Sequence, residues 1–155
     1  MITESARYQG AVLAHIVDNW DGPIAIRRAF GEAAGFYILN ERLPIFIKYS
    51  TKRYSPWTFT FQREHQMRQQ ALFDKLGECL MVFGCGRDGI AAISHQDFRK
   101  VLDNYFEEQE SVSLRRRHAE MYKIRGRDGE LERKIGRNSL IDLLSSLKES
   151  GQFDP

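Results

Sequence analysis

The segment of residues 43–66 constrains the fold most, because it contains two runs with the two-residue period of β-strands. Both faces of Leu43–Ser50 are largely apolar, as in a strand near the middle of a sheet. Trp57–Phe61 alternates aromatic residues with threonine, which predicts a strand with one buried face. We therefore expect these two strands to pair with each other across the turn at residues 51–56.

Helical and strand patterns alternate along the remainder of the chain. Apolar residues recur at spacings of three and four in segments that we predict to be helices: Thr3–Trp20, Arg63–Leu76, residues 95–106 after a Ser94 cap, and Leu140–Lys148. Short apolar runs predict further strands at Phe36–Leu39, Cys79–Cys85 and Ile90–Ile93, with late strand-like runs at Met121–Arg125 and Glu130–Ile135. Residues 24–30 are ambiguous, because they fit a strand but Ala25–Ala34 could equally form a short helix that ends at Gly35, and we favour the helix.

These elements predict an α+β fold, in which helices pack on a mixed or antiparallel sheet of about five to seven strands. The length predicts one domain over residues 1–155. The basic hairpin and helix of residues 111–150 form a candidate subdomain within it.

Several classes of protein are disfavoured by the sequence. No apolar run approaches the roughly 20 residues of a membrane helix, and the N-terminus lacks a signal-peptide pattern, so we expect a cytoplasmic protein without a membrane partner. Cys79 and Cys85 lie in or beside one apolar run and are expected to be reduced core residues. No spacing typical of a metal site or a phosphate-binding loop occurs, so we expect no metal and no cofactor.

Positive charge is concentrated in two segments, although the net charge is only +2. Residues 42–68 contain six Lys or Arg against one acid, and residues 111–137 contain nine against four. If the fold brings these segments together, they form a surface suited to an anion.

The first basic segment combines cations with aromatic rings. Its candidate nucleic-acid-binding residues are Lys48, Lys52, Arg53, Tyr54 and Trp57. Lysine and arginine neutralise phosphates, and exposed tyrosine or tryptophan rings stack on unpaired bases. The alternative is a hairpin whose rings fill the core and whose cations face water.

The second basic segment supplies three consecutive candidates, Arg115, Arg116 and Arg117. Neighbouring residues on a strand point to opposite faces, so at least one of these arginines must leave the core side or pair with an acid. Phosphate binding is the functional interpretation. A solvated hairpin, or contact with the acidic patch of a protein partner, remains open.

The order helix, strand, strand, strand, helix, strand over Thr3–Cys85 resembles the core of the restriction-endonuclease-like, or PD-(D/E)XK, nucleases. In that family an acid and an acid-x-Lys on adjacent strands hold a divalent metal that activates water. Lys48 stands where the family's lysine is expected, but Phe46 and Asn40 stand where its carboxylates would be sought. The one literal acid-x-Lys, Glu132 to Lys134, lies in the late basic segment. The resemblance covers just over half of the chain and implies a degenerate, inactive member.

We therefore expect a small soluble protein that binds nucleic acid, DNA or RNA, or another polyanion through a basic, aromatic hairpin and an arginine-rich strand. One alternative is a non-catalytic interaction or regulatory module whose partner is another protein or a second copy of the chain. A metal-dependent nuclease is the second alternative, and it requires carboxylates such as Glu4, Glu32 or Glu41 to converge on Lys48. The sequence favours a role without catalysis.

Overall fold

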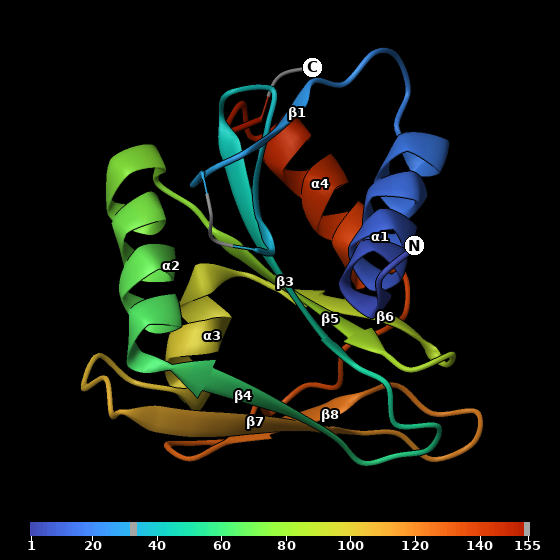
Figure 1. Cartoon of the computed structure of the whole chain (residues 1–155), viewed down its shortest axis with the longest axis vertical. Helices are drawn as coiled ribbons and strands as arrows, with labels where there is room; N and C mark the ends of the chain where they lie inside the picture. The colour runs from blue at the N-terminus through green and yellow to red at the C-terminus, as the bar shows by residue number, and fades with distance from the viewer. Residues whose placement is uncertain (32–33, 154–155) are drawn as a thin grey trace.

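The computed structural model describes residues 1–31 and 34–153, which contain four helices and eight strands. The α+β class predicted from the sequence is confirmed, with the strands divided between two sheets (Figure 1). The helices are α1 (Glu4–Asn19), α2 (Arg63–Leu76), α3 (His95–Val101) and α4 (Ser139–Glu149). The strands are β1 (Ile26–Arg28), β2 (Phe36–Leu39), β3 (Leu43–Ser50), β4 (Trp57–Gln62), β5 (Leu80–Cys85), β6 (Gly89–Ile93), β7 (Gln109–Arg115) and β8 (Lys123–Gly126).

The larger sheet has five strands in the order β1-β2-β3-β5-β6. β3 and β5 run parallel, and the other neighbours are antiparallel. Because parallel strands end at the same edge of a sheet, the chain segments that follow β3 and β5 meet there. The Gly86 N–H donates a hydrogen bond to the Ser50 carbonyl at 2.8 Å.

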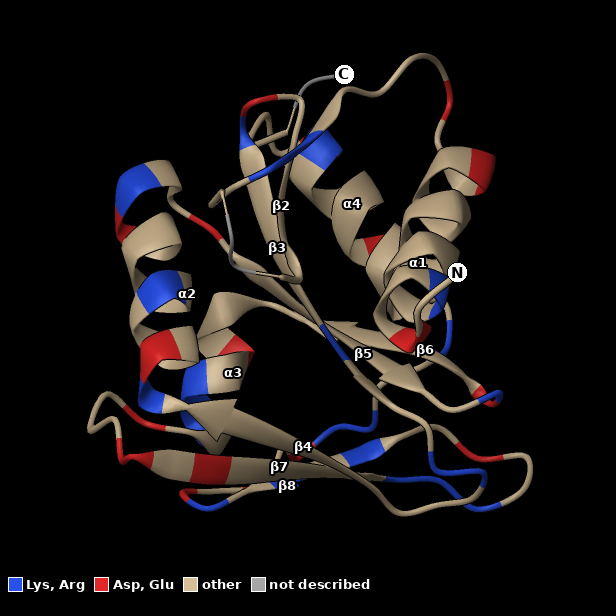
Figure 2. Cartoon of the chain, viewed as in Figure 1, with Lys and Arg blue, Asp and Glu red and all other residues tan. Residues whose placement is uncertain are grey.

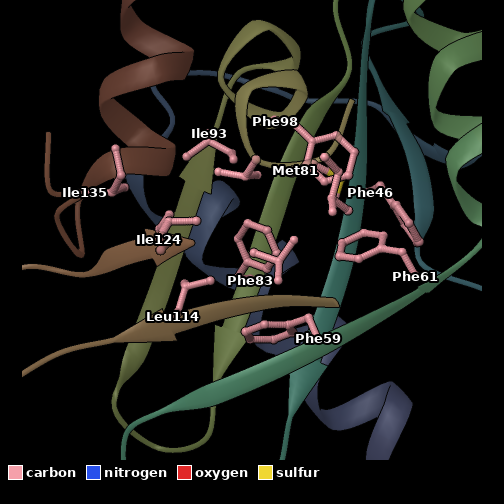
Figure 3. Packing of buried hydrophobic residues seen from close by; sticks show 14 of the residues in the cluster. Phe46, Phe59, Phe61, Met81, Phe83, Ile93, Phe98, Leu114, Ile124 and Ile135 are labelled. Carbon is pink, nitrogen blue, oxygen red and sulfur yellow. The ribbon is translucent and has the colours of Figure 1, made fainter. Parts of the chain in front are cut away.

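The smaller sheet is antiparallel, with three strands in the order β4-β7-β8. The prediction that Trp57–Phe61 pairs with Leu43–Ser50 is therefore wrong. Both edges of β3 are taken by β2 and β5. β4 instead crosses the face of the larger sheet, where Phe59 packs edge-on against Phe83 with ring centroids 4.9 Å apart (Figure 3).

The larger sheet is covered on both faces (Figure 1). One face packs against the apolar stripes of α1 and α4, through residues such as Ile16 and Leu144. The other face packs against β4, β7 and β8 and against residues of α2 and α3, such as Leu72 and Phe98 (Figure 3). The interior strand β5, which lies between β3 and β6, is buried along its whole length, and this explains its continuous apolar run.

Two local predictions need correction. Residues 24–30 contain the strand β1 rather than a helix, because Ile26–Arg28 pairs with β2 and the Ala25 N–H donates to the Asn40 side chain at 2.8 Å. The helix after Ser94 ends at Val101 and does not reach Phe106, because the backbone becomes extended at Leu102.

The predicted burial of the two cysteines is confirmed. Cys79 and Cys85 are free and buried, and burial raises the pKa of both thiols. Within the described part of the chain, no helix combines the length and the apolar character needed to cross a bilayer.

Candidate nucleic-acid interface

The loop after β3 and the segment after β7 lie side by side (Figure 1), because Trp57 of β4 pairs with Leu114 of β7. The Arg116 N–H donates to the Ser55 hydroxyl at 3.0 Å, a contact between residues 61 positions apart in the chain. Figure 2 shows the lysine and arginine positions of these two segments at the same end of the molecule. The fold thus joins the two basic segments identified in the sequence.

Trp57 anchors the first of these segments from inside. Its side chain is only 2% exposed, and its indole N–H donates to the Lys52 carbonyl at 2.8 Å. Its ring packs edge-on against Tyr122 with centroids 5.9 Å apart. The predicted stacking role of Trp57 on a base therefore conflicts with its burial, and its role here is to shape the loop.

Tyr54 has the exposed ring that Trp57 lacks. It is 67% exposed, and the Arg53 guanidinium lies 5.3 Å from its ring centroid. Lys52 and Arg53 are both exposed. This loop therefore presents two cations and one flat ring to solvent.

Arg116 joins the segment after β7 to the turn between β5 and β6. Its Nε and Nη2 contact the two carboxylate oxygens of Asp88 at 2.8 and 2.5 Å, and the side chains are 11% and 17% exposed. The Tyr122 hydroxyl donates to the same carboxylate at 2.6 Å. These hydrogen bonds, led by that from Arg116, hold the pKa of Asp88 below its usual value. The prediction that one of the three arginines must leave the core side or pair with an acid is confirmed.

Asp88→Asn is expected to lower the free energy of unfolding by about 2 kcal/mol, because it leaves the largely buried Arg116 charge without a carboxylate. Urea unfolding at neutral pH measures the change. Arg116→Gln and the double variant complete a thermodynamic cycle, in which the double variant should lose less stability than the sum of the two single changes. Simple additivity would show that the pair contributes nothing.

Arg115 points to the outer face of the three-stranded sheet. It pairs across the ladder with Lys123, and Arg125 lies two residues further along β8. With Ser113 and Glu130 these cations line a hollow of about 200 Å³. Lys123 approaches Glu130 at 3.4 Å. Neither Arg115 nor Arg125 has an ion pair with another described residue.

Lys48 lies apart from these loops, in a pocket of about 400 Å³ between α1, β3 and α2. Its amine lies 5.9 and 5.3 Å from the ring centroids of Phe46 and Phe61, and burial lowers its pKa. His65 lines the same pocket, and burial, followed by the charge of Lys48, lowers the pKa of its imidazole. None of the described residues that line this pocket is acidic.

Lys48→Met is expected to raise the free energy of unfolding by about 1 kcal/mol at neutral pH, because it removes a desolvated charge from beside two aromatic rings. The gain should shrink as the pH rises through the lowered lysine pKa, because the neutral amine carries little desolvation cost. Thermal unfolding at pH 7 and at about pH 10 compares the two proteins. A variant less stable than the parent at pH 7 would contradict this description of Lys48.

The carboxylates required for a nuclease do not gather at Lys48 among the described residues. Glu41 forms an exposed ion pair with Arg27 at 2.6 Å, and Glu4 does not line the pocket. Phe46 stacks on Phe36 with ring centroids 3.8 Å apart. Glu32, the remaining candidate, lies outside the described residues.

Three carboxylates do approach one another elsewhere, in the loop before β7, in β7 and in the turn after β8. Each of Asp103, Glu110 and Asp128 has an oxygen within 4.8 Å of the others. The buried Glu110 accepts a short hydrogen bond from Gln66, and Asp128 accepts from the Asp103 N–H at 2.8 Å. The first bond joins β7 to α2, and the second joins the turn after β8 to the loop before β7.

The sequence placed Lys123 and Arg125 in the second basic segment without choosing them as individual binding residues, and it did not select Arg87 at all. Lys123 and Arg125 alternate with the buried Tyr122 and Ile124, and this two-residue period is the signal that could have placed them on an outer face. Arg87 carried no such signal. Its position beside the other cations depends on the parallel pairing of β3 with β5.

Comparisons with known proteins give little more. No family model matches the sequence, and no curated protein matches it. Among solved structures, Hjc, a Holliday junction resolvase from the archaeal hyperthermophile Archaeoglobus fulgidus, matches with a TM-score of 0.43 and 12% identity. The match covers 66% of this chain and 84% of that chain. A likeness of this strength assigns the chain neither a family nor a function.

Proposed function

We propose that the protein binds DNA or RNA through the surface at which the two basic segments meet, and we call this surface the basic edge. Its cations are Lys52, Arg53, Arg87, Arg115 and Arg117, which are all exposed. The observation that carries the proposal is the contact of Arg116 with Ser55, which unites cations distant in the sequence. None of these five cations forms an ion pair with another described residue. Their neighbour Arg116 differs, because it forms an ion pair with Asp88.

The chemistry of this surface favours the nucleic-acid backbone over base edges. Lysine and arginine side chains on exposed loops neutralise phosphates and release counterions without reading sequence. Tyr54, with Arg53 against its ring, offers one place for an unpaired base to stack. Hydroxyls of Thr58 and Ser111 on the outer face of the small sheet add neutral hydrogen-bonding groups. We infer strong, salt-sensitive binding with weak sequence preference.

The test is a binding measurement by fluorescence anisotropy with labelled single- and double-stranded DNA and RNA at about 50 mM salt. Binding to at least one of these ligands is the expected result. Failure to bind all of them would overturn the proposal and favour the protein-interaction module. Adding Mg²⁺ or Mn²⁺ in parallel tests the nuclease alternative, because cleavage of the labelled strand would reveal a metal-dependent active site.

A further inference from the structure

A hollow of about 340 Å³ lies between α1 and the β5–β6 hairpin. Tyr8 and Val12 of α1 contribute apolar surface, as does Ile90 of β6. Arg7 and Arg87 also line the hollow, from the helix and from the hairpin turn. The volume falls in the range of roughly 300–1,000 Å³ that is typical of small-molecule sites.

Gly84, a buried residue of the interior strand β5, also lines the hollow. A Cβ atom at this position would lie 3.5 Å from the Tyr49 Cβ and 3.6 Å from the Tyr8 ring, which are ordinary contacts. The two neighbouring glycines differ, because a Cβ at Gly86 would lie 2.2 Å from the Lys52 carbonyl oxygen and one at Gly89 would lie 2.9 Å from the Tyr122 hydroxyl. Packing therefore requires Gly86, whose close contact is with backbone, whereas the contacts at Gly89 are with the side chains of Arg137 and Tyr122. Gly84 is buried beneath the Tyr8 ring, so Tyr8 and this part of β5 together form the floor of the hollow.

The charges of the hollow identify the chemical class of the ligand. Arg7 and Arg87 are exposed, and neither has an ion pair within the described ranges. No acidic side chain of the described residues lines the hollow. An apolar wall beside two guanidinium groups suits a molecule with a flat, weakly polar body and an anionic end.

The hollow adjoins the basic edge. Arg87 belongs to both, and the Gly86 backbone lies against the Lys52 carbonyl. The rings of Tyr8 and Tyr49 are stacked with centroids 4.8 Å apart, and Tyr8 is the member of this pair that lines the hollow. On a surface that binds nucleic acid, the molecule that combines a flat body with an anion is a nucleotide.

We propose that this hollow binds a single nucleotide, with its base beside Tyr8 and Gly84 and its phosphate between Arg7 and Arg87. The choice of a nucleotide rests on the proposed function, because the basic edge is what favours it over other aromatic anions. The nucleotide is either free or the 5′-terminal residue of a bound strand. The two sources share the same chemistry and differ in what is attached to the sugar.

The test is calorimetric titration of the full-length protein with adenosine 5′-monophosphate, adenosine and inorganic phosphate. The monophosphate should bind with a dissociation constant below about 1 mM, and the other two at least about tenfold more weakly, because each fills half of the site. Absence of monophosphate binding to the parent protein would overturn the inference.

Gly84→Ala and Gly84→Val form a graded series that crowds the Tyr8 ring at the floor of the hollow. The alanine variant should melt at the same temperature as the parent or higher, because alanine suits a strand better than glycine, yet should bind the nucleotide several-fold more weakly. The valine variant should bind more weakly still. Arg7→Gln should weaken the monophosphate and leave adenosine unchanged. Equal affinity of all these folded variants for the monophosphate would contradict the site.

Oligonucleotides distinguish the two sources and separate this inference from the proposed function. A terminal nucleotide predicts that a 5′-phosphorylated strand binds more tightly than its 5′-hydroxyl form, and that Arg7→Gln removes the difference. A free nucleotide predicts equal binding of both strands. Binding of the monophosphate without binding of oligonucleotides would overturn the proposed function but not the nucleotide site. Binding of oligonucleotides without binding of the monophosphate would overturn the nucleotide site but not the proposed function.

Discussion

Replacing Lys52 and Arg53 together by glutamate is expected to lower the affinity for DNA or RNA by about a hundredfold or more at moderate salt. Each exposed cation that contacts a phosphate contributes through counterion release, and each new carboxylate repels the backbone. The Trp57 indole N–H donates a hydrogen bond to the backbone carbonyl of Lys52, and a change of the Lys52 side chain leaves this bond in place. The thermal stability of the variant should therefore match that of the parent.

Arg28→Glu/Lys75→Glu is the matched control. It makes the same change in net charge at two exposed positions, on β1 and at the end of α2, and Figure 1 shows both elements away from the loop that follows β3. We expect the control to retain nucleic-acid binding within a few-fold. An equal loss of affinity in both double variants would indicate that only net charge matters, and would contradict a defined surface.

Lowering the pH from 7 to 4 is expected to remove about 3 kcal/mol of stability through His95, with about 2 kcal/mol of this lost by pH 5. This residue is 5% exposed, stacks on Phe73 with ring centroids 3.7 Å apart, and contacts the Gln69 side chain through Nδ1. Burial, followed by the charge of Arg99, lowers the pKa of its imidazole to about 4. The unfolded chain has the ordinary pKa near 6.5 and so binds the proton first. Stability is therefore complete above the unfolded value and falls as the pH drops toward the folded value.

Urea unfolding between pH 4 and 7.5 measures this effect, with His95→Gln as the control. The variant loses the ring stack on Phe73 and should be less stable at pH 7, but its stability should change much less with pH. Parent and variant curves with the same slope over this range would show that His95 does not titrate as described.

Local patterns predicted the elements whose period is strong. Phe36–Leu39, Leu43–Ser50 and Arg63–Leu76 have the bounds expected from the sequence, because turn residues and Gly77 delimit clear alternating or helical runs. Gly77 ends α2 in the left-handed conformation, which glycine adopts more readily than other residues.

Long-range pairing could not be predicted in the same way. β4 alternates like a strand of any sheet, and nothing in Trp57–Gln62 specifies that its partner is β7 rather than β3. The burial of α2 shows the same difficulty, because the polar Gln66 is buried while the apolar Met67 is 56% exposed. Gln66 is satisfied by Glu110, a partner 44 residues away that helical periodicity does not reveal.

The candidate site was predictable to a similar extent. Charge counting found the two basic segments, and strand geometry required one of the three consecutive arginines to leave the core side or find an acid. The identity of that acid, Asp88, and the burial of Trp57 depend on how the two sheets pack. Residue type alone could not separate the cations that face solvent from the one that joins two loops.

The most direct test of the basic edge is the slope of the logarithm of affinity against the logarithm of salt concentration for a single-stranded ligand. If each of its cations contacts one phosphate, the slope for the parent protein should be about −3 to −4, at roughly −0.7 per contact on single strands. Lys52→Glu/Arg53→Glu should reduce that slope by at least about one unit. A slope near zero, or an identical slope in parent and variant, would contradict the claim that this surface binds the nucleic-acid backbone.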